Sequence, residues 1–149
     1  MNGVFIDSNV IIFHLTGNKK AKQILKKCED KEIDGYVNLI VFSEVFYNFI
    51  KLITKMKAFQ LKKHPERVAS IDFSEIKRLF KIFSFLEINR DIAETSMEIV
   101  NEYGLLPNDA LIAATCKYYG IKKIATFDED FKRVEFLEVI DLKEKGKEK

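Results

Sequence analysis

Four acidic residues stand at the ends of elements that the sequence pattern predicts. Asp7 directly follows the apolar run at residues 4–6, and Asp128 follows a second short run with alanine and phenylalanine. Asp109 lies in the first turn of one predicted helix, and Glu44 lies near the start of another. Because the carboxyl ends of parallel strands share one edge of a sheet, these four side chains could meet in one crevice.

Carboxylates gathered in this way would favour one kind of chemistry. Four ionised groups within a few ångströms repel one another and raise each other's pKa unless cations neutralise them. Oxygen ligands without a neighbouring histidine or cysteine select Mg²⁺ or Mn²⁺ over zinc. Two such ions about 3.5–4 Å apart hydrolyse phosphodiesters, one activating a water and the other stabilising the leaving oxygen. The acids therefore predict a metal-dependent hydrolase that acts on a phosphate ester.

Each acid also has an ordinary structural interpretation when it is taken alone. Asp7 could be the N-cap of a helix that follows the strand, and Asp109 could complement a helix dipole. Glu44 could be a rim residue, and Asp128 could begin a turn. The combination favours a functional site, because four separate elements each contribute one acid at the same predicted edge.

The elements that must position these acids alternate along the chain. Apolar runs predict strands at 4–6, 36–37, 85–88, 122–127 and 135–140. Periodic apolar residues with capping signals predict helices over 18–30, 38–56, 72–83, 90–103 and 107–119, and the basic segment 57–70 is interpreted as a loop or a broken helical connection. This alternation predicts a three-layer α/β/α sandwich around a mostly parallel central sheet.

Composition bounds the domain organisation and the location. A chain of 149 residues with 47% hydrophobic and 32% charged residues fits one domain, expected over 1–142, with a mobile polar tail at 143–149. It has neither a run of about 18 apolar residues nor a secretory signal, so we expect no membrane contact and a cytoplasmic location. Cys28 and Cys116 lack metal-binding spacing and are expected to be reduced core thiols. The net charge of +2 does not by itself indicate a nucleic-acid binder.

The order and spacing of four motifs resemble a known family. The stretches FIDSNVII, SEVFYNF, LLPNDALIAATC and ATFDEDF are similar to those of the PIN domain, and most closely to its VapC-like toxin ribonucleases. The likeness runs from Val4 to about Ile140. Each motif is weak alone, and the ordered set is specific.

The resemblance implies a fold, an activity and partners. It implies a Rossmann-like sheet and an Mg²⁺- or Mn²⁺-dependent endoribonuclease for single-stranded RNA, commonly a homodimer that a small antitoxin protein holds inactive. The conserved acids of the family fall on Asp7, Glu44, Asp109 and Asp128. We expect Asp7 and Asp109 to be the firmest metal ligands, while Glu44 and Asp128 complete the site or orient the attacking water.

Several residues near the four acids are expected to support them. Ser8 and Thr126 match hydroxyl positions that line the site in the family. Asp130 is interpreted as the cap of the turn that carries the following phenylalanine. Asn48, one turn after Glu44, is considered as a hydrogen-bond partner of that carboxylate.

Two features depart from the family pattern. The basic segment 57–70 is longer than in compact members, and Asn38 replaces the usual serine or threonine at its helix cap. Neither removes an acid, so they bear on substrate choice and on the fit of a partner.

Other functions remain open. One is a PIN-type RNA-processing nuclease outside any toxin pair, and another is a PIN-like module that binds without cutting. A third is a haloacid-dehalogenase-like phosphatase, which would need a second acid where Asn9 stands. That missing acid counts against the phosphatase.

Overall fold

The computed structural model describes residues 3–142, and the predicted mobile tail at 143–149 lies outside them. Within that range five strands form one sheet in the order β3-β2-β1-β4-β5, and every neighbouring pair is parallel. The strands are β1 (Gly3–Ile6), β2 (Asp34–Asn38), β3 (Ser84–Leu86), β4 (Lys123–Ala125) and β5 (Glu138–Ile140). The predicted three-layer architecture with a parallel sheet is confirmed.

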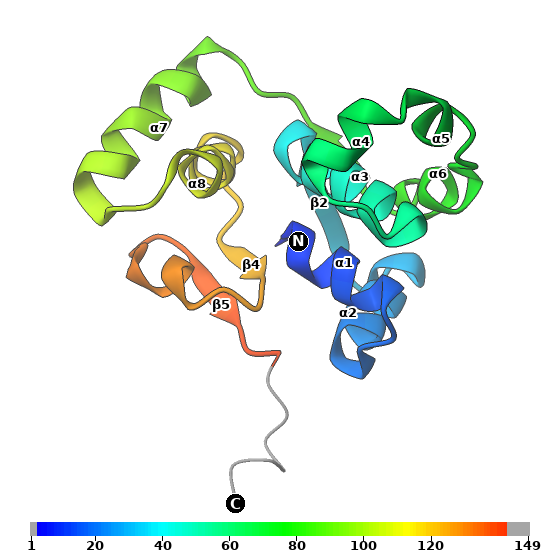
Figure 1. Cartoon of the computed structure of the whole chain (residues 1–149). Helices are drawn as coiled ribbons and strands as arrows, with labels where there is room; N and C mark the ends of the chain where they lie inside the picture. The colour runs from blue at the N-terminus through cyan, green and yellow to red at the C-terminus, as the bar shows by residue number, and fades with distance from the viewer. Residues whose placement is uncertain (1–2, 143–149) are drawn as a thin grey trace, which may run out of the picture.

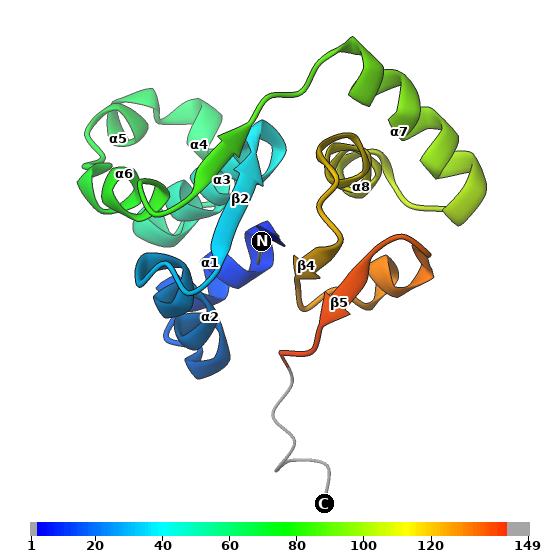
Figure 2. The same ribbon diagram turned by 180° about the vertical axis from the view of Figure 1, so that it is seen from behind.

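Helices cover both faces of the sheet (Figures 1 and 2). One side carries α1 (Ser8–Leu15), α2 (Lys19–Glu29), α3 (Leu39–Thr54), α4 (Ala58–Lys63), α5 (Pro65–Ala69) and α6 (Ser74–Phe80). The other side carries α7 (Arg90–Tyr103) and α8 (Pro107–Tyr119), and the 3₁₀ helix η1 (Glu129–Arg133) lies beside β5. The strand order reverses direction at β1, so the crevice beyond its carboxyl end is the expected ligand site.

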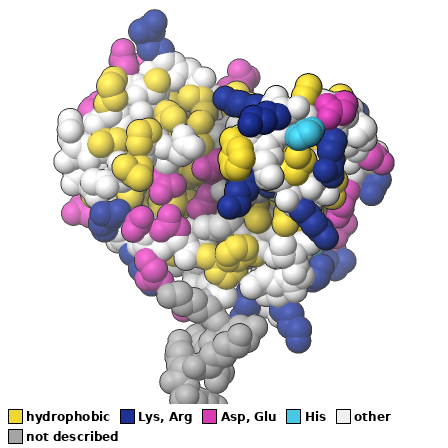
Figure 3. All heavy atoms as spheres, in the orientation of Figure 1, with side chains coloured by type: hydrophobic (Ala, Val, Ile, Leu, Met, Phe, Trp, Pro, Cys, Tyr) yellow, Lys and Arg dark blue, Asp and Glu magenta, His cyan; other side chains and the backbone are white. Residues whose placement is uncertain are grey.

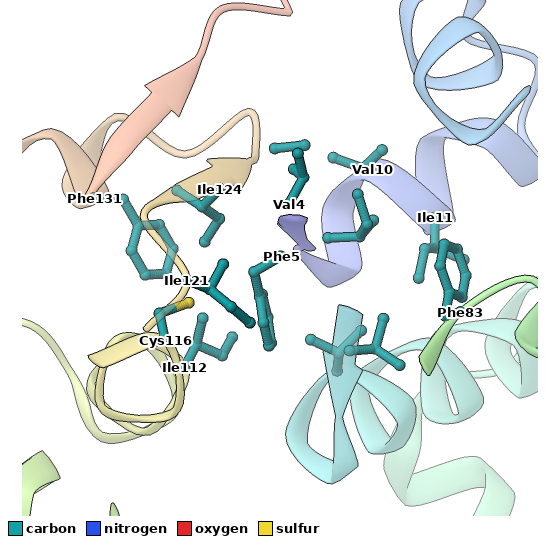
Figure 4. Close-up of a cluster of buried hydrophobic side chains, with 14 of the residues drawn as sticks. Val4, Phe5, Val10, Ile11, Phe83, Ile112, Cys116, Ile121, Ile124 and Phe131 are labelled. Atoms are coloured by element: carbon teal, nitrogen blue, oxygen red, sulfur yellow. The ribbon is translucent and has the colours of Figure 1, made fainter. Parts of the chain in front are cut away.

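The core forms where apolar strands meet the inward sides of the helices. Phe5 and Ile124 on neighbouring strands are fully buried, and Phe131 of η1 packs on the same side (Figure 4). The two cysteines, Cys28 and Cys116, are buried and unbonded, and burial raises the pKa of the Cys28 thiol to about 11. Both therefore behave as apolar core groups, as the sequence predicted.

Local capping signals set most of the helix ends. Asn18 and Asn38 each accept a hydrogen bond from the backbone N–H three residues on, at 2.9 and 3.1 Å. Asn38 is fully buried, and its amide also donates to Thr115 Oγ1 at 2.9 Å, which ties α3 to α8. Gly104 ends α7 with a φ of 71°, a left-handed conformation that favours glycine.

The structure decides one open expectation and departs from two local sequence patterns. The segment 57–70 forms the short helices α4 and α5, which is the broken helical connection rather than a loop. Asp72 and Glu75 have the spacing of a capping box, but the Asp72 carboxylate accepts from the N–H and the hydroxyl of Ser74 instead. Ile53 continues the apolar spacing of α3 but is 54% exposed, because the buried side of the helix runs through Val41, Val45 and Phe49.

Within residues 3–142, no helix combines the length and the apolar character needed to cross a membrane.

Candidate functional site

The carboxyl ends of β1 and β4 lie side by side and carry two of the four predicted acids. Ile6 pairs with Ala125, and the N–H of Asp7 continues the ladder by donating to the Ala125 carbonyl at 3.0 Å. This register places Asp7 beside the segment from Thr126 to Asp128. Asp7 and Asp128 therefore come together although 121 positions separate them in the sequence.

Asp7 is almost completely buried, with 4% of its surface exposed. Its Oδ1 accepts from the N–H of Ser8 and its Oδ2 accepts from the Thr126 hydroxyl, both at 2.7 Å. Burial raises its pKa to about 6, the two hydrogen bonds oppose this rise, and the charges of Glu44 and Asp128 add to it. Asp7 is thus both the N-cap of α1 and an acid of the crevice, and the two interpretations hold together.

Glu44 reaches the same crevice from the second turn of α3. Ser8 Oγ donates to its Oε1 at 2.8 Å, and Asn108 Nδ2 donates to its Oε2 at 3.2 Å. The expected partner Asn48 instead donates to the backbone carbonyl of Glu44 at 2.8 Å, so that prediction is wrong. An asparagine one turn further along a helix reaches the main chain of its own helix more easily than a side chain that points away.

Asp109 lies in the first turn of α8, half-buried, facing the other acids. One carboxylate oxygen each of Asp109, Asp128 and Asp130 lies within 4.8 Å of the other two. Burial raises the pKa of Asp109 to about 7, and the negative charges of Asp7, Asp128, Glu44 and Asp130 add to this in that order. The four predicted acids therefore lie within electrostatic range of one another. We call Asp7, Glu44, Asp109 and Asp128 the acidic site.

The interpretation of Asp130 as a turn cap is wrong. Asp128 caps η1 by accepting from the N–H of Asp130 at 2.8 Å. The Asp130 carboxylate is exposed, lies near Asp109 and Asp128, and also pairs with Arg133 at 3.4 Å. Asp130 is therefore a fifth acid at the edge of the site.

Thr126 and Asn9 connect the loop after β4 to the start of α1. The Thr126 hydroxyl donates to Asp7, accepts from the N–H of Asp128 at 3.0 Å, and accepts from Asn9 Nδ2 at 3.2 Å. Asn9 Oδ1 also accepts from the N–H of Phe127 at 3.2 Å. Asn9 therefore holds the loop in place where a phosphatase of the alternative class would carry a general acid.

Sequence reasoning missed Asn9, Asn108 and Asp130 as contributors to this region. The signal for Asn108 was its position directly before a predicted metal ligand at the start of a helix. The signal for Asn9 was its position two residues after Asp7, in the first turn of the helix that follows, which places its amide near the same acids.

Thr126→Val should lower the free energy of unfolding by about 1–3 kcal/mol, because Asp7 would lose a donor and the Asp128 N–H would lose an acceptor. Urea denaturation at pH 8, where Asp7 is ionised, measures this loss. Thr126→Ser keeps the hydroxyl and loses one buried methyl group, so it should lower the free energy of unfolding by about 0.8 kcal/mol, less than the valine variant. Equal stability of the valine and serine variants would contradict the network.

The chemistry of the donor set fits divalent cations. On the face shown in Figure 3, acidic side chains gather in the middle and several lysine or arginine side chains lie to their right. The site offers carboxylate oxygens, and the pKa values of Asp7 and Asp109 are raised. Among the described residues, no histidine or cysteine adds a ligand atom to the group of Asp109, Asp128 and Asp130. Hard oxygen donors of this kind suit Mg²⁺ or Mn²⁺.

The sequence and the structure are similar to those of known proteins. Residues 4–137 match the family model described as the PIN domain. Ribonuclease VapC2 of Methanocaldococcus jannaschii is 49% identical over 95% of each chain, and Ribonuclease VapC6 of the same organism is 36% identical over 93% of this chain and 97% of its own. A chain of a toxin-antitoxin complex from Klebsiella pneumoniae superposes with a TM-score of 0.66 at 24% identity, covering 95% of this chain and 98% of its own.

Proposed function

This chain belongs to the PIN domain family, and from that premise we propose that it is a metal-dependent endoribonuclease that cleaves single-stranded RNA. The observation that carries the proposal is the acidic site, in which four carboxylates from distant parts of the chain lie within electrostatic range of one another. Burial and mutual repulsion raise the pKa of Asp7 and of Asp109. Bringing such groups together is unfavourable unless cations neutralise them.

We assign the ligand roles from the pattern of acids in the PIN domain family. Asp7 and Asp109 would hold Mg²⁺ or Mn²⁺, with Glu44 and Asp128 completing the site. A bound divalent ion supplies a water of lowered pKa and stabilises the charge that develops on the leaving oxygen. Asp130, which lies near Asp109 and Asp128, joins the set as a further candidate ligand.

The chain's own residues orient these ligands. The Ser8 N–H and the Thr126 hydroxyl fix both oxygens of Asp7, and the Ser8 hydroxyl and Asn108 amide fix those of Glu44. Such outer hydrogen bonds set the direction of a ligand's lone pairs. In-line attack on the RNA phosphate would leave a 5′-phosphate and a 3′-hydroxyl, and no histidine is needed.

We further propose that the protein is the toxin of a toxin-antitoxin pair, working in the cytoplasm as a homodimer that a small antitoxin holds inactive. Two relatives carry the name VapC, and the structural relative described above was solved as a toxin-antitoxin complex. A small reading frame overlapping this one upstream would favour the toxin over an RNA-processing nuclease.

The full-length chain should cleave a single-stranded RNA oligonucleotide in millimolar Mn²⁺ or Mg²⁺ and stop when EDTA removes the metal. End-labelled RNA resolved on denaturing gels measures cleavage. Labelling of the new 5′ end by a polynucleotide kinase only after phosphatase treatment identifies the 5′-phosphate. A matched RNA duplex serves as the control and should be cut much more slowly. Undiminished cleavage in EDTA, or none with either metal, would reject the proposal.

A further inference from the structure

Two phenylalanines form an aromatic pair beside the acidic site. Phe13 on α1 is 39% exposed, and Phe127, half-buried, lies in the connection between β4 and η1. Their ring centroids are 4.9 Å apart, with planes tilted by 48°. Phe127 stands between Thr126, which donates to Asp7, and Asp128, which belongs to the acidic site. Phe127 is therefore one residue from Asp128 of the acidic site and one residue from the hydroxyl that donates to Asp7.

The chain fixes the pair rather than leaving it loose. Asn9 and Phe13 are four residues apart on α1 and so face the same side of that helix. Asn9 contacts the N–H of Phe127 and the hydroxyl of Thr126, while the Phe13 ring meets the Phe127 ring. The carbonyl of Phe13 also accepts from the N–H of Asn18 at 2.9 Å. The backbone of Phe127 is thus held by the network that orients Asp7, and the Phe13 ring contacts the ring of Phe127.

Phe13 lies on α1 outside the buried side of that helix. That helix buries Val10 and Ile11 on its inward side, yet continues with an aromatic residue where solvent reaches it. In Figure 3 hydrophobic side chains lie next to the acidic ones on this face. Single exposed apolar residues are common on protein surfaces, so the position of this pair, one residue from Asp128, is what indicates a binding surface, rather than its exposure.

We propose that Phe13 and Phe127 form a stacking platform for one nucleobase next to the phosphodiester that is cut. The inference rests on the proposed ribonuclease function and adds how the site selects single strands. Every base has a flat face that can stack on an aromatic ring, and in a duplex the neighbouring bases already cover those faces. The platform would therefore position an unpaired nucleotide over the acidic site without reading its sequence.

Phe13→Ala should raise KM for a short single-stranded RNA about 10-fold and leave kcat within about twofold. The reason is that losing the stacking contact with one ring weakens the binding of a base by about 10-fold. Initial rates in saturating Mn²⁺, fitted for both constants, measure the split. Phe13→Leu keeps an apolar contact with Phe127 but has no aromatic face, so it should behave like alanine. Phe13→Trp should stay within about twofold of the wild type.

The same RNA lacking one base next to the cut tests the contact directly. Its KM with the wild type should rise about as much as that of intact RNA with Phe13→Ala, and combining the two changes should add little, since they remove the same interaction. Phe59→Ala is the matched control, because Phe59 is 63% exposed on α4 and should leave KM unchanged. Melting temperatures of all variants verify folding.

The possible failures are distinguishable. Wild-type cleavage with an unchanged KM for both Phe13→Ala and Phe13→Leu would overturn the stacking platform and leave the ribonuclease proposal standing. Lack of cleavage by the wild type with either metal would overturn both. A loss of inhibition by a partner protein, with KM untouched, would assign the pair to that partner and also overturn the platform.

Discussion

Asp109→Asn is expected to reduce RNA cleavage more than about 100-fold. Replacing a residue that only orients a metal ligand typically costs 10–100-fold, and removing a ligand itself should cost more. The same substitution should raise the stability of the metal-free protein at pH 8, because the asparagine side chain carries no charge. The pKa of Asp109 is raised to about 7 by burial and by the neighbouring acids, so ionising it in the folded state is unfavourable. Opposite effects on activity and on stability are the signature of a functional carboxylate.

Asp91→Asn provides a matched control for this variant. Asp91 also lies in the first turn of a helix, α7, but it is exposed and outside the acidic site. Its replacement should leave cleavage unchanged and lower stability slightly through the helix dipole. Initial cleavage rates and thermal melts in EDTA measure both effects. Retained cleavage by Asp109→Asn, or a less stable metal-free variant, would contradict the assignment of Asp109.

The stability of the metal-free protein should fall as pH rises from about 5 to 8. Asp7 and Asp109 have folded-state pKa values of about 6 and about 7, above the 3.8 of an unfolded aspartate. Over this window the folded state binds more protons than the unfolded state, so raising the pH favours unfolding. For the buried Asp7 alone the fall between pH 5 and pH 8 amounts to about 1.4 kcal/mol, because roughly half of the effect of its raised pKa lies below pH 5. Asp109 is partly exposed and adds to the trend in the same direction.

Mn²⁺ should reverse that fall at high pH and have little effect at low pH, because cations compete with protons for the same carboxylates. A ligand at 100 times its Kd stabilises the folded state by about 2.7 kcal/mol. For a chain of this size that corresponds to an increase in Tm of about 5–10 °C at pH 8. Melts at pH 5 and pH 8, with and without Mn²⁺, measure the linkage.

Asp109→Asn should lose most of the Mn²⁺ effect in the same melts, whereas Asp91→Asn should keep it. A shift in Tm that is equally large at pH 5 and pH 8 would mean that Mn²⁺ binds elsewhere. If the free energy of unfolding does not change between these pH values, the pKa values of Asp7 and Asp109 are not raised in the folded protein.

Local sequence patterns were sufficient for most of the elements. The apolar run of β1, the asparagine caps Asn18 and Asn38, and the glycine that ends α7 act through interactions within a few residues. The sequence also pointed to one edge of the sheet for the acids, since each follows a strand or opens a helix. The inward side of α3 was less well predicted, because its direction depends on how the helix packs against its neighbours.

By itself the sequence determined the parallel α/β architecture and which acids stand at the ends of its elements, because periodicity and capping are local properties. Only the tertiary structure decided which atoms meet: the Ser8 hydroxyl with Glu44, Asn9 with Thr126 and Phe127, and Asp130 with Asp109 and Asp128. Such contacts join positions up to 119 residues apart, as between Asp7 and Thr126. Strand register and helix packing set them, and a shift of one residue in a strand would turn its side chains to the other face of the sheet.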